Sequence, residues 1–453
     1  MSKDRRALLY VVFGAFALCA LLTKSHATSW NDASRFATID SLANRGTFAI
    51  ENSSFARQTS DSYRYRGHTY GEPPEPALFG TAVAFALKGA GITPDNRRGL
   101  WIYLITLFVV GSSFSLGCGY AFAFARALGY SVHLSAFSAA LSGAATLNLP
   151  YAIVYSNHVL VGTAVLAGVY HLFRLRDGTG HPCAAGLFFG LAFAFDQAAG
   201  FAALIAIIML YRAPRSSVLV FLAASIPFVF LELFLNWKLS GSLLSPGLND
   251  SFWSGAQLKA TSLHLKPARD YVSNLASMTI GNKGLFVYTP LTFVCVFGLA
   301  KLWSSGKADL RRLTAAIVAG SALYFILMVL FTFDSLSSNY GERRFVEIFF
   351  ILCVGLAPAI ASLRAPLARL AALIAAVVSI VMAALGTVNP FAGQGALPGY
   401  VIAAGEFRRL FVHAPLQAGI DLVALLTVIA LAVRFWPAPD GTPRQSLAPP
   451  AAT

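Results

Sequence analysis

Charged side chains are scarce in this sequence. Only 12% of the 453 residues are Asp, Glu, Lys or Arg, whereas soluble globular chains carry about 25%. Hydrophobic residues make up 57% of the chain, and the mean hydropathy is +0.65. Too few polar side chains are present to cover a molecule of this size in water, so the composition excludes a soluble enzyme.

Cysteine is also scarce. The five cysteines lie singly in or beside apolar stretches (Cys19, Cys118, Cys183, Cys295 and Cys353). They show neither zinc spacing nor a disulfide framework, and the eight histidines form no HExxH motif. We interpret the cysteines as small packing residues. The acids are compatible with Mg²⁺ or Ca²⁺, but no spacing requires a cation, so we predict no metal ligands.

Acidic residues are outnumbered by basic ones, 20 to 34, which gives a net charge of +14. A basic balance is also typical of nucleic-acid binding. Here, however, the basic residues separate apolar blocks and are not concentrated in one polar domain, a pattern typical of membrane topology. We therefore predict a lipid bilayer as the partner and no nucleic acid.

Apolar blocks of about 20 residues predict membrane-spanning helices. They run at about 7–23, 100–124, 131–149, 159–173, 183–211, 216–236, 284–303, 312–333, 345–362, 366–388 and 413–436. The first is also compatible with a signal peptide, since Ser25-His26-Ala27 resembles a cleavage site, although we expect a retained anchor. Block 183–211 has Asp196 at its centre, which predicts two short helices with Asp196-Gln197 near the turn. Block 76–92 predicts a juxtamembrane or re-entrant helix.

These blocks predict about twelve spans with both chain ends in the cytoplasm. The inner segments are then short and basic, at Arg126, Arg174 with Arg176, Arg212 with Arg215, Lys301 to Arg312, and Arg364 with Arg369. Two long loops, about 24–75 and 237–283, lie outside. Most of the acids fall outside as well. Carboxylate chemistry is therefore expected on the extracytoplasmic face.

Residues 31–46 predict an interfacial helix. Asn31 or Asp32 is expected to cap its start and Gly46 to end it, while Phe36, Ile39 and Leu42 or Ala43 share one apolar face. Such a helix lies on a membrane surface and holds Asp32 beside the outer end of the first span. From these residues alone, Asp32 is either a helix cap or a functional acid.

Several patches resemble a known family. They are residues 30–37 (WNDASRFA), 42–50 (LANRGTFAI), 61–70 (DSYRYRGHTY), Pro73-Pro74, Tyr151 to His158, 236–242 (NWKLSGS), 284–290 (GLFVYTP) and 340–345 (YGERRF). In this order, over about residues 7–362, they are similar to the polyprenyl-phosphate-sugar-dependent membrane glycosyltransferases of the GT-C fold. Relatives of this kind include the protein mannosyltransferases and the aminoarabinose transferases.

The resemblance implies an all-α polytopic membrane protein with a large first extracytoplasmic loop that carries juxtamembrane helices. It implies residues 1–362 as the catalytic module, with 24–99 as the first outer loop region and 237–283 as the second. Residues 363–436 are expected to add C-terminal spans, and 437–453 a disordered cytoplasmic tail. The expected location is the inner membrane of a bacterium.

The family has an essential acid early in the first outer loop, and Asp32 matches it. The implied reaction transfers a sugar from a polyprenyl phosphate to a glycan or protein acceptor, with a carboxylate as general base. Asp61 and Glu72 are further candidate acids. Groups expected to bind the lipid phosphate or the substrate are Arg343, Arg344, Arg64, Arg66, Lys283, His158, Asp196 and Tyr340.

The sequence departs from the family before the paired prolines. Relatives commonly carry Asp-Lys there, whereas this chain has Gly71-Glu72, followed by Glu75 where Gly is usual. The missing Lys removes one expected phosphate partner. A non-catalytic protein that binds a lipid-linked sugar therefore stays open as an alternative. A transporter or flippase is the other, although we find no internal repeat of the kind such folds show.

Overall fold

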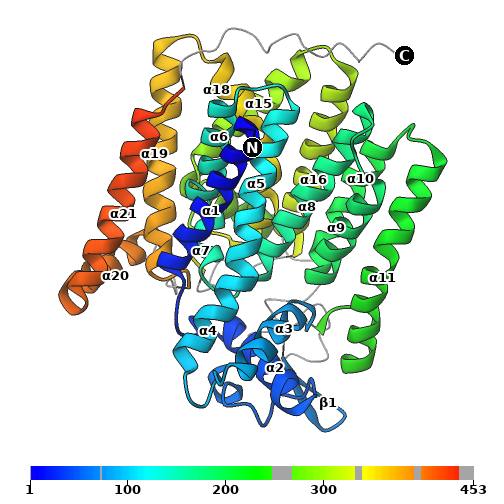
Figure 1. Cartoon of the computed structure of the whole chain (residues 1–453), viewed down its shortest axis with the longest axis vertical. Helices are drawn as coiled ribbons and strands as arrows, with labels where there is room; N and C mark the ends of the chain where they lie inside the picture. Colours follow the sequence, from blue (N-terminus) through cyan, green and yellow to red (C-terminus); the bar gives the residue numbers. More distant parts are fainter. Residues whose placement is uncertain (1, 72–73, 247–267, 332–338, 392–398, 438–453) are drawn as a thin grey trace.

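The computed structural model describes residues 2–71, 74–246, 268–331, 339–391 and 399–437. Within these ranges the regular secondary structure consists of helices and one two-stranded hairpin. The predicted all-α polytopic membrane fold is therefore confirmed. The long helices run roughly side by side, and a layer of shorter elements closes one end of the bundle (Figure 1).

Seven described helical segments are long and apolar enough to cross a membrane. They are α1 (Lys3–Leu22), α4 with α5 (Arg98–Ala127), α8 with its 3₁₀ extension (Asn157–Asp177), α11 (Arg215–Ser240), α16 (Ala308–Phe331), α17 with α18 (Arg343–Ser362) and α19 (Pro366–Val388). Four shorter apolar helices lie among them: α6 (Val132–Ala144), α9 (Pro182–Phe195), η4 with α10 (Gln197–Leu210) and α15 (Leu291–Ser304). The count of twelve spans stays a prediction.

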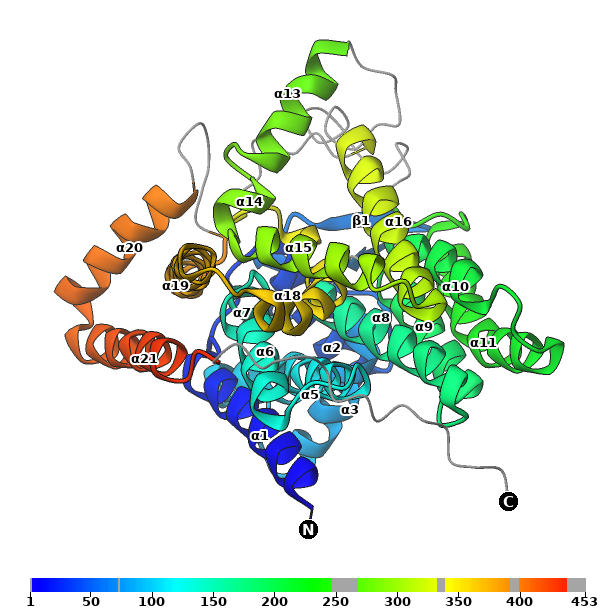
Figure 2. The ribbon, with the colours of Figure 1, turned by 90° about the horizontal axis from the view of Figure 1, so that it is seen from above.

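The C-terminal helices form one side of the bundle. Seen from above, α19, α20 (Gly399–His413) and α21 (Pro415–Arg434) lie opposite α10 (Ala202–Leu210) and α11 (Figure 2). The α20 helix was not among the predicted elements. The predicted tail beyond residue 437 and residues 247–267 of the second outer loop lie outside the described residues. The described remainder of that loop contains α13 (Ala268–Thr279), and the short α14 (Leu285–Tyr288) follows it.

The predicted break at Asp196 is confirmed. Helix α9 ends at Phe195, and Asp196 has extended backbone angles (φ −162°, ψ 124°). Its Oδ1 then accepts a hydrogen bond from the amide of Ala198 at 2.9 Å, which caps the 3₁₀ segment that opens the next helix. Oδ1 of Asp196 thus satisfies a free amide at this helix start. Its second carboxylate oxygen, Oδ2, accepts from the side chain of Asn157.

Two glycines let α15 and the α17–α18 segment approach closely. A Cβ atom on Gly298 would lie 1.7 Å from the carbonyl oxygen of Gly355, and one on Gly355 would lie 2.0 Å from that of Cys295. Side chains at these positions are therefore excluded by backbone atoms. Small residues at helix contacts are the usual means of close packing inside membranes.

The layer at one end of the bundle contains α2 (Trp30–Arg45), β1 (Ser62–Tyr65), β2 (His68–Gly71) and α3 (Glu75–Gly89), beside the start of α4 (Figure 1). The two strands pair antiparallel, with Tyr63 opposite Tyr70. Arg66 and Gly67 both have positive φ angles, 49° and 83°, which suit a two-residue hairpin turn.

Two expectations for α2 need correction. The N-cap is Ser29, whose Oγ accepts from the amide of Asp32, and not Asn31 or Asp32. In addition, twelve of the sixteen residues of α2 are buried, so the helix is enclosed on more than the single apolar face that was predicted. The C-terminal prediction is confirmed, because Gly46 ends the helix in the left-handed conformation (φ 66°).

Candidate functional site

Asp32 is held by residues just before its own helix. Its side chain is buried, and Oδ2 accepts hydrogen bonds from Oγ1 of Thr28 at 2.6 Å and from the amide of Thr28 at 3.2 Å. Because Ser29 caps the helix, the Asp32 carboxylate is not needed for that purpose. Its other oxygen, Oδ1, is buried and has no hydrogen-bond partner among the described residues. One oxygen is thus fixed by Thr28, and the other is able to accept a further hydrogen bond.

The surroundings of Asp32 alter its proton affinity. Burial raises the pKa of Asp32 above its ordinary value of 3.8, whereas the Thr28 hydrogen bonds and the nearby Arg35 guanidinium act in the opposite direction. A raised pKa makes a carboxylate a stronger base once it has lost its proton. The net effect therefore favours proton acceptance.

Arg35 connects α2 to the start of α8. Its side chain is buried and donates from Nη2 to Oδ1 of Asn157 at 3.0 Å. Its Nη1 donates to the carbonyl oxygen of Tyr155 at 3.2 Å and also contacts Oδ1 of Asn31. A planar guanidinium can make all of these bonds at once, so Arg35 fixes the loop before α8 relative to Asp32.

Asn157 extends this connection to the break after α9. Its Nδ2 donates to Oδ2 of Asp196 at 3.0 Å and to the carbonyl oxygen of Phe195 at 3.1 Å. Residues from three separate parts of the chain, Arg35, Asn157 and Asp196, therefore form one line of hydrogen bonds.

The line ends in three side chains that we call the His–carboxylate cluster: His158, Asp196 and Glu347. Nδ1 of His158 lies 2.7 Å from Oε1 of Glu347 and 3.8 Å from Oδ2 of Asp196. One potential ligand atom from each of the three residues lies within 4.8 Å of the others. His158 and Glu347 are buried, and Asp196 is partly exposed.

Two arginines lie beside the cluster. Arg343 and Arg344 form the 3₁₀ turn η7 (Arg343–Phe345) that precedes α17 (Val346–Leu352), and both act electrostatically on His158. Nη1 of Arg344 lies 3.4 Å from Oε1 of the buried Glu342. Nε of Arg343 is buried and has no hydrogen-bond partner among the described residues.

Other predicted site residues lie apart from the cluster. Arg64 and Arg66 are exposed on the β1–β2 hairpin. Tyr340 is buried, and its hydroxyl donates to the carbonyl oxygen of Met382 at 2.7 Å, which joins it to α19. Lys283 is buried and donates to the carbonyl oxygen of Asn339. Both side chains thus donate to backbone carbonyl groups, and the Tyr340 ring also packs edge-on against Tyr288.

The two further candidate acids have different positions. The carbonyl oxygen of Asp61 accepts a hydrogen bond from Oγ of Ser34 at 2.7 Å. Ser34 follows Asp32 by two residues and so lies on a different side of the helix; this contact therefore does not bring Asp61 to the Asp32 carboxylate. Glu72 lies outside the described residues.

Three participants were missed by the sequence analysis: Glu347, Arg35 and Asn157. Glu347 carried a usable signal, because ionisable residues within membrane spans are costly and commonly functional. Arg35 carried none, since α2 was expected to bury only one apolar face. Asn157 carried none, since a neutral amide near the end of an apolar block is ordinary.

A second pair of acids lies next to this region. Glu75 at the start of α3 and Glu232 on α11 are both buried, and their carboxyl groups lie against each other. Burial, together with the charge of Glu232, raises the pKa of Glu75 well above its usual range. Asn236 donates to Glu232 at 2.8 Å, whereas neither oxygen of Glu75 has a hydrogen-bond donor among the described residues.

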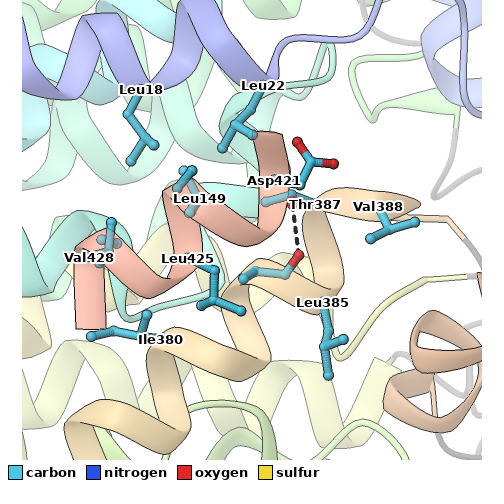
Figure 3. Close-up of a pocket in the computed structure, with 13 residues that line it drawn as sticks. Leu18, Leu22, Leu149, Ile380, Leu385, Thr387, Val388, Asp421, Leu425 and Val428 are labelled. Atoms are coloured by element: carbon cyan, nitrogen blue, oxygen red, sulfur yellow. Dashed lines mark hydrogen bonds between the residues drawn. The ribbon is translucent and has the colours of Figure 1, made fainter. Parts of the chain in front are cut away.

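Cavities of the described part differ in character. A narrow cavity of about 50 Å³ between α1, α19 and α21 is lined almost entirely by apolar side chains, with Asp421 at one end (Figure 3). A larger hollow of about 460 Å³ includes Thr28, the partner of Asp32, together with His26, Glu406 and Arg409. The hollow is the better candidate for substrate access, because its lining includes charged and polar side chains and reaches the residue that holds Asp32.

Comparison with known proteins gives a match at the level of structure. No family model matches this chain, and no curated protein matches its sequence. A crystal structure of ArnT from Cupriavidus metallidurans bound to undecaprenyl phosphate is similar to it, with a TM-score of 0.52 and 15% identity, over 95% of this chain and 76% of that one. The apo state of ArnT matches with a TM-score of 0.53 and 16% identity, over 96% and 76%.

The match extends over nearly the whole chain, so it includes the terminal layer as well as the bundle. Identity at this level supports shared architecture and not shared chemistry. The chain is therefore a polytopic membrane protein with the GT-C fold of ArnT.

Proposed function

We propose that this protein is a membrane glycosyltransferase that moves a sugar from a polyprenyl phosphate to an extracytoplasmic acceptor. The observation that carries the proposal is the state of Asp32, which is buried, oriented by Thr28 and left with one unpaired oxygen. The GT-C fold supports this proposal, because a crystal structure of ArnT, which has the same fold, contains bound undecaprenyl phosphate.

In the proposed reaction, Oδ1 of Asp32 accepts the proton of an acceptor hydroxyl group. The hydroxyl oxygen attacks the anomeric carbon of the sugar as the bond from that carbon to the phosphate oxygen breaks. The polyprenyl phosphate leaves with the electron pair of the broken bond. Thr28 keeps the Asp32 carboxylate oriented throughout, which is the positioning that general base catalysis requires.

The leaving phosphate needs positive charge in a partly dry site. Arg343 and Arg344 are the best candidates among the predicted arginines, since they lie beside the buried cluster and Nε of Arg343 has no partner among the described residues. Arg64 and Arg66 are exposed on the hairpin and are weaker candidates. Lipopolysaccharide, another surface glycan and a protein are all compatible acceptors.

A non-catalytic protein that binds a lipid-linked sugar is the alternative. It is favoured by the absence of the Lys expected before Pro73-Pro74, where this chain carries Glu72. A transporter or flippase has less support, because the sequence shows no internal repeat. A glycosyltransferase cleaves the bond between the sugar and the polyprenyl phosphate, whereas a binding protein leaves it intact, and this difference is measurable.

The test uses the full-length protein in proteoliposomes with a panel of radiolabelled polyprenyl-phosphate sugars and an extract of cell-envelope glycans as acceptor. We expect transfer by the intact protein and a loss of about 10²–10⁴-fold in Asp32→Asn, the range typical of general base catalysis. Asp177→Asn is the matched control, since Asp177 is exposed in a turn distant in sequence from the site. Unchanged transfer in Asp32→Asn would remove the proposed base, and donor binding without transfer would favour the alternative.

A further inference from the structure

We infer that the His–carboxylate cluster of His158, Asp196 and Glu347 binds a divalent transition-metal ion. The three side chains come from α8, the break after α9 and α17, which are remote in sequence. The fold nevertheless brings one imidazole nitrogen and two carboxylates to within 4.8 Å of one another.

The separations are close to those of ligands on a single ion. Zinc lies about 2.0–2.2 Å from nitrogen and carboxylate ligands, so two ligand atoms on one zinc ion are about 3–4 Å apart. Nδ1 of His158 is 2.7 Å from Oε1 of Glu347 and 3.8 Å from Oδ2 of Asp196. The 3.8 Å separation lies in that range, whereas Nδ1 of His158 and Oε1 of Glu347 lie at hydrogen-bond distance and would move apart to hold one ion together with Asp196.

An unsatisfied buried oxygen points independently to a ligand. Glu347 is fully buried, and its Oε2 has no hydrogen-bond partner among the described residues. Leaving a buried carboxyl oxygen without a partner is costly. A bound cation removes that cost and also separates the two carboxylates of the cluster.

The surrounding residues hold the ligands in place. Asn157 donates to Oδ2 of Asp196, and the amide of Ala198 donates to its Oδ1. Ligand carboxylates in metal sites are commonly oriented by such outer hydrogen bonds. The side chain of Asp196 is 26% exposed, so this ligand of the cluster is the one accessible from outside the protein interior.

The donor set indicates the class of metal. Imidazole nitrogen suits zinc and its transition-metal neighbours, whereas Mg²⁺ and Ca²⁺ favour sites made of oxygen alone. Three protein ligands with an open position are typical of a reactive zinc site and not of a closed structural one. We therefore assign the cluster to Zn²⁺ or an ion of similar preference.

Arginines set the charge balance around the cluster. Arg35 and Arg344 act electrostatically on Asp196, and Arg343 joins them near His158. The carboxylates of Asp196 and Glu347, with Glu342 beside Arg344, offset this positive charge. Metal binding by the cluster is independent of the proposed sugar transfer, because it is measured without any sugar donor or acceptor.

The test uses the full-length protein in detergent, purified with a tag that contains no histidine and stripped with a chelator. Zn²⁺ is added in known amounts, and the metal retained after desalting is measured by inductively coupled plasma mass spectrometry. We expect about one Zn²⁺ per chain and little retention of Mg²⁺. In Glu347→Gln we expect the affinity for Zn²⁺ to fall at least tenfold.

The control is Asp309→Asn, which removes an exposed acid at the start of α16, outside the cluster, and should leave the zinc content unchanged. His158→Cys, which keeps a zinc ligand, should retain the metal, whereas His158→Gln should lose it. Size-exclusion chromatography and circular dichroism confirm that each variant is folded. Less than a tenth of an equivalent of zinc in the intact protein, or equal uptake by folded Glu347→Gln, overturns the inference.

Discussion

Arg35 of α2 donates a hydrogen bond from Nη2 to the side-chain oxygen of Asn157, at the start of α8, at 3.0 Å. Arg35 follows Asp32 by three residues on the same helix, and the amide nitrogen of Asn157 binds Asp196. The proposed base and the His–carboxylate cluster are thus joined through two side chains. A disturbance of this bond is expected to affect both.

Replacing Arg35 with lysine tests that connection. Lysine keeps the positive charge but lacks the planar fork that reaches Asn157 and Tyr155 together. We expect Arg35→Lys to lower sugar transfer at least tenfold and to reduce stability by about 1–3 kcal/mol, because buried acceptors lose their donors. Transfer rate and the midpoint of thermal unfolding are the two measurements.

The matched control for Arg35→Lys is Arg269→Lys. The Arg269 side chain is 87% exposed beside Asp270, and exposed ion pairs contribute little to stability. Both measurements should therefore stay at the wild-type level. If Arg35→Lys behaves like Arg269→Lys, the hydrogen-bond line from α2 to Asp196 has no functional role.

The pH dependence of transfer tests the role of Thr28. Burial raises the pKa of Asp32, and the proposed base must be ionised to act, so activity should fall as the pH falls through a value above 3.8. The Thr28 hydroxyl stabilises the ionised form. In Thr28→Val the pKa should rise further, and the acid limb of the pH–rate profile should move to higher pH. A limb that stays in place or moves to lower pH contradicts the assignment of Asp32 as the base.

The orientation of the chain in the membrane is a separate prediction. The hairpin that carries Arg64 is expected on the extracytoplasmic side, whereas Cys183, which is exposed at the start of α9, is expected on the cytoplasmic side. A membrane-impermeant maleimide applied to intact cells should label Arg64→Cys strongly. Cys183 in the unmodified protein should be labelled only after the membrane is opened, and the reverse pattern would invert the topology.

Close packing of α15 predicts a strong effect from one added methyl group. In Gly298→Ala the new Cβ would lie 1.7 Å from the backbone oxygen of Gly355, so the two helices must separate. We expect a loss of about 1–3 kcal/mol or more, as for overpacked cores, measured as a lower thermal midpoint in detergent. Gly14→Ala, in α1 with nothing within 4 Å of the new atom, should be neutral or slightly stabilising.

Most of the architecture could be predicted from the sequence, because the length of each apolar block and the basic residues between blocks depend on local composition. The break at Asp196 is an example, since a carboxylate in the middle of a long apolar block is too costly to leave inside a helix. The cap of α2 was misassigned because Ser29, Asn31 and Asp32 are all good caps. Only the backbone path shows that Ser29 serves this purpose and leaves the Asp32 carboxylate available.

The candidate site was less accessible to prediction, since its parts are remote in sequence. His158, Asp196 and Glu347 show no spacing that links them, and they meet only because α8, α9 and α17 pack together. Arg64 and Arg66 show another limit: they belong to a family-like segment, and the hairpin places both on the exposed surface, where their binding role stays a prediction. Sequence patterns identified residue types suited to phosphate, and tertiary packing decides which of them can reach it.

The β1–β2 hairpin has a practical consequence for imaging. A bundle that is mostly embedded in detergent or lipid offers few features for aligning particles in electron microscopy. The turn at Arg66-Gly67 is exposed, and paired strands anchor it on both sides. A small rigid domain inserted at this turn would project from the terminal layer and serve as a fiducial marker, with its orientation fixed by the two strands.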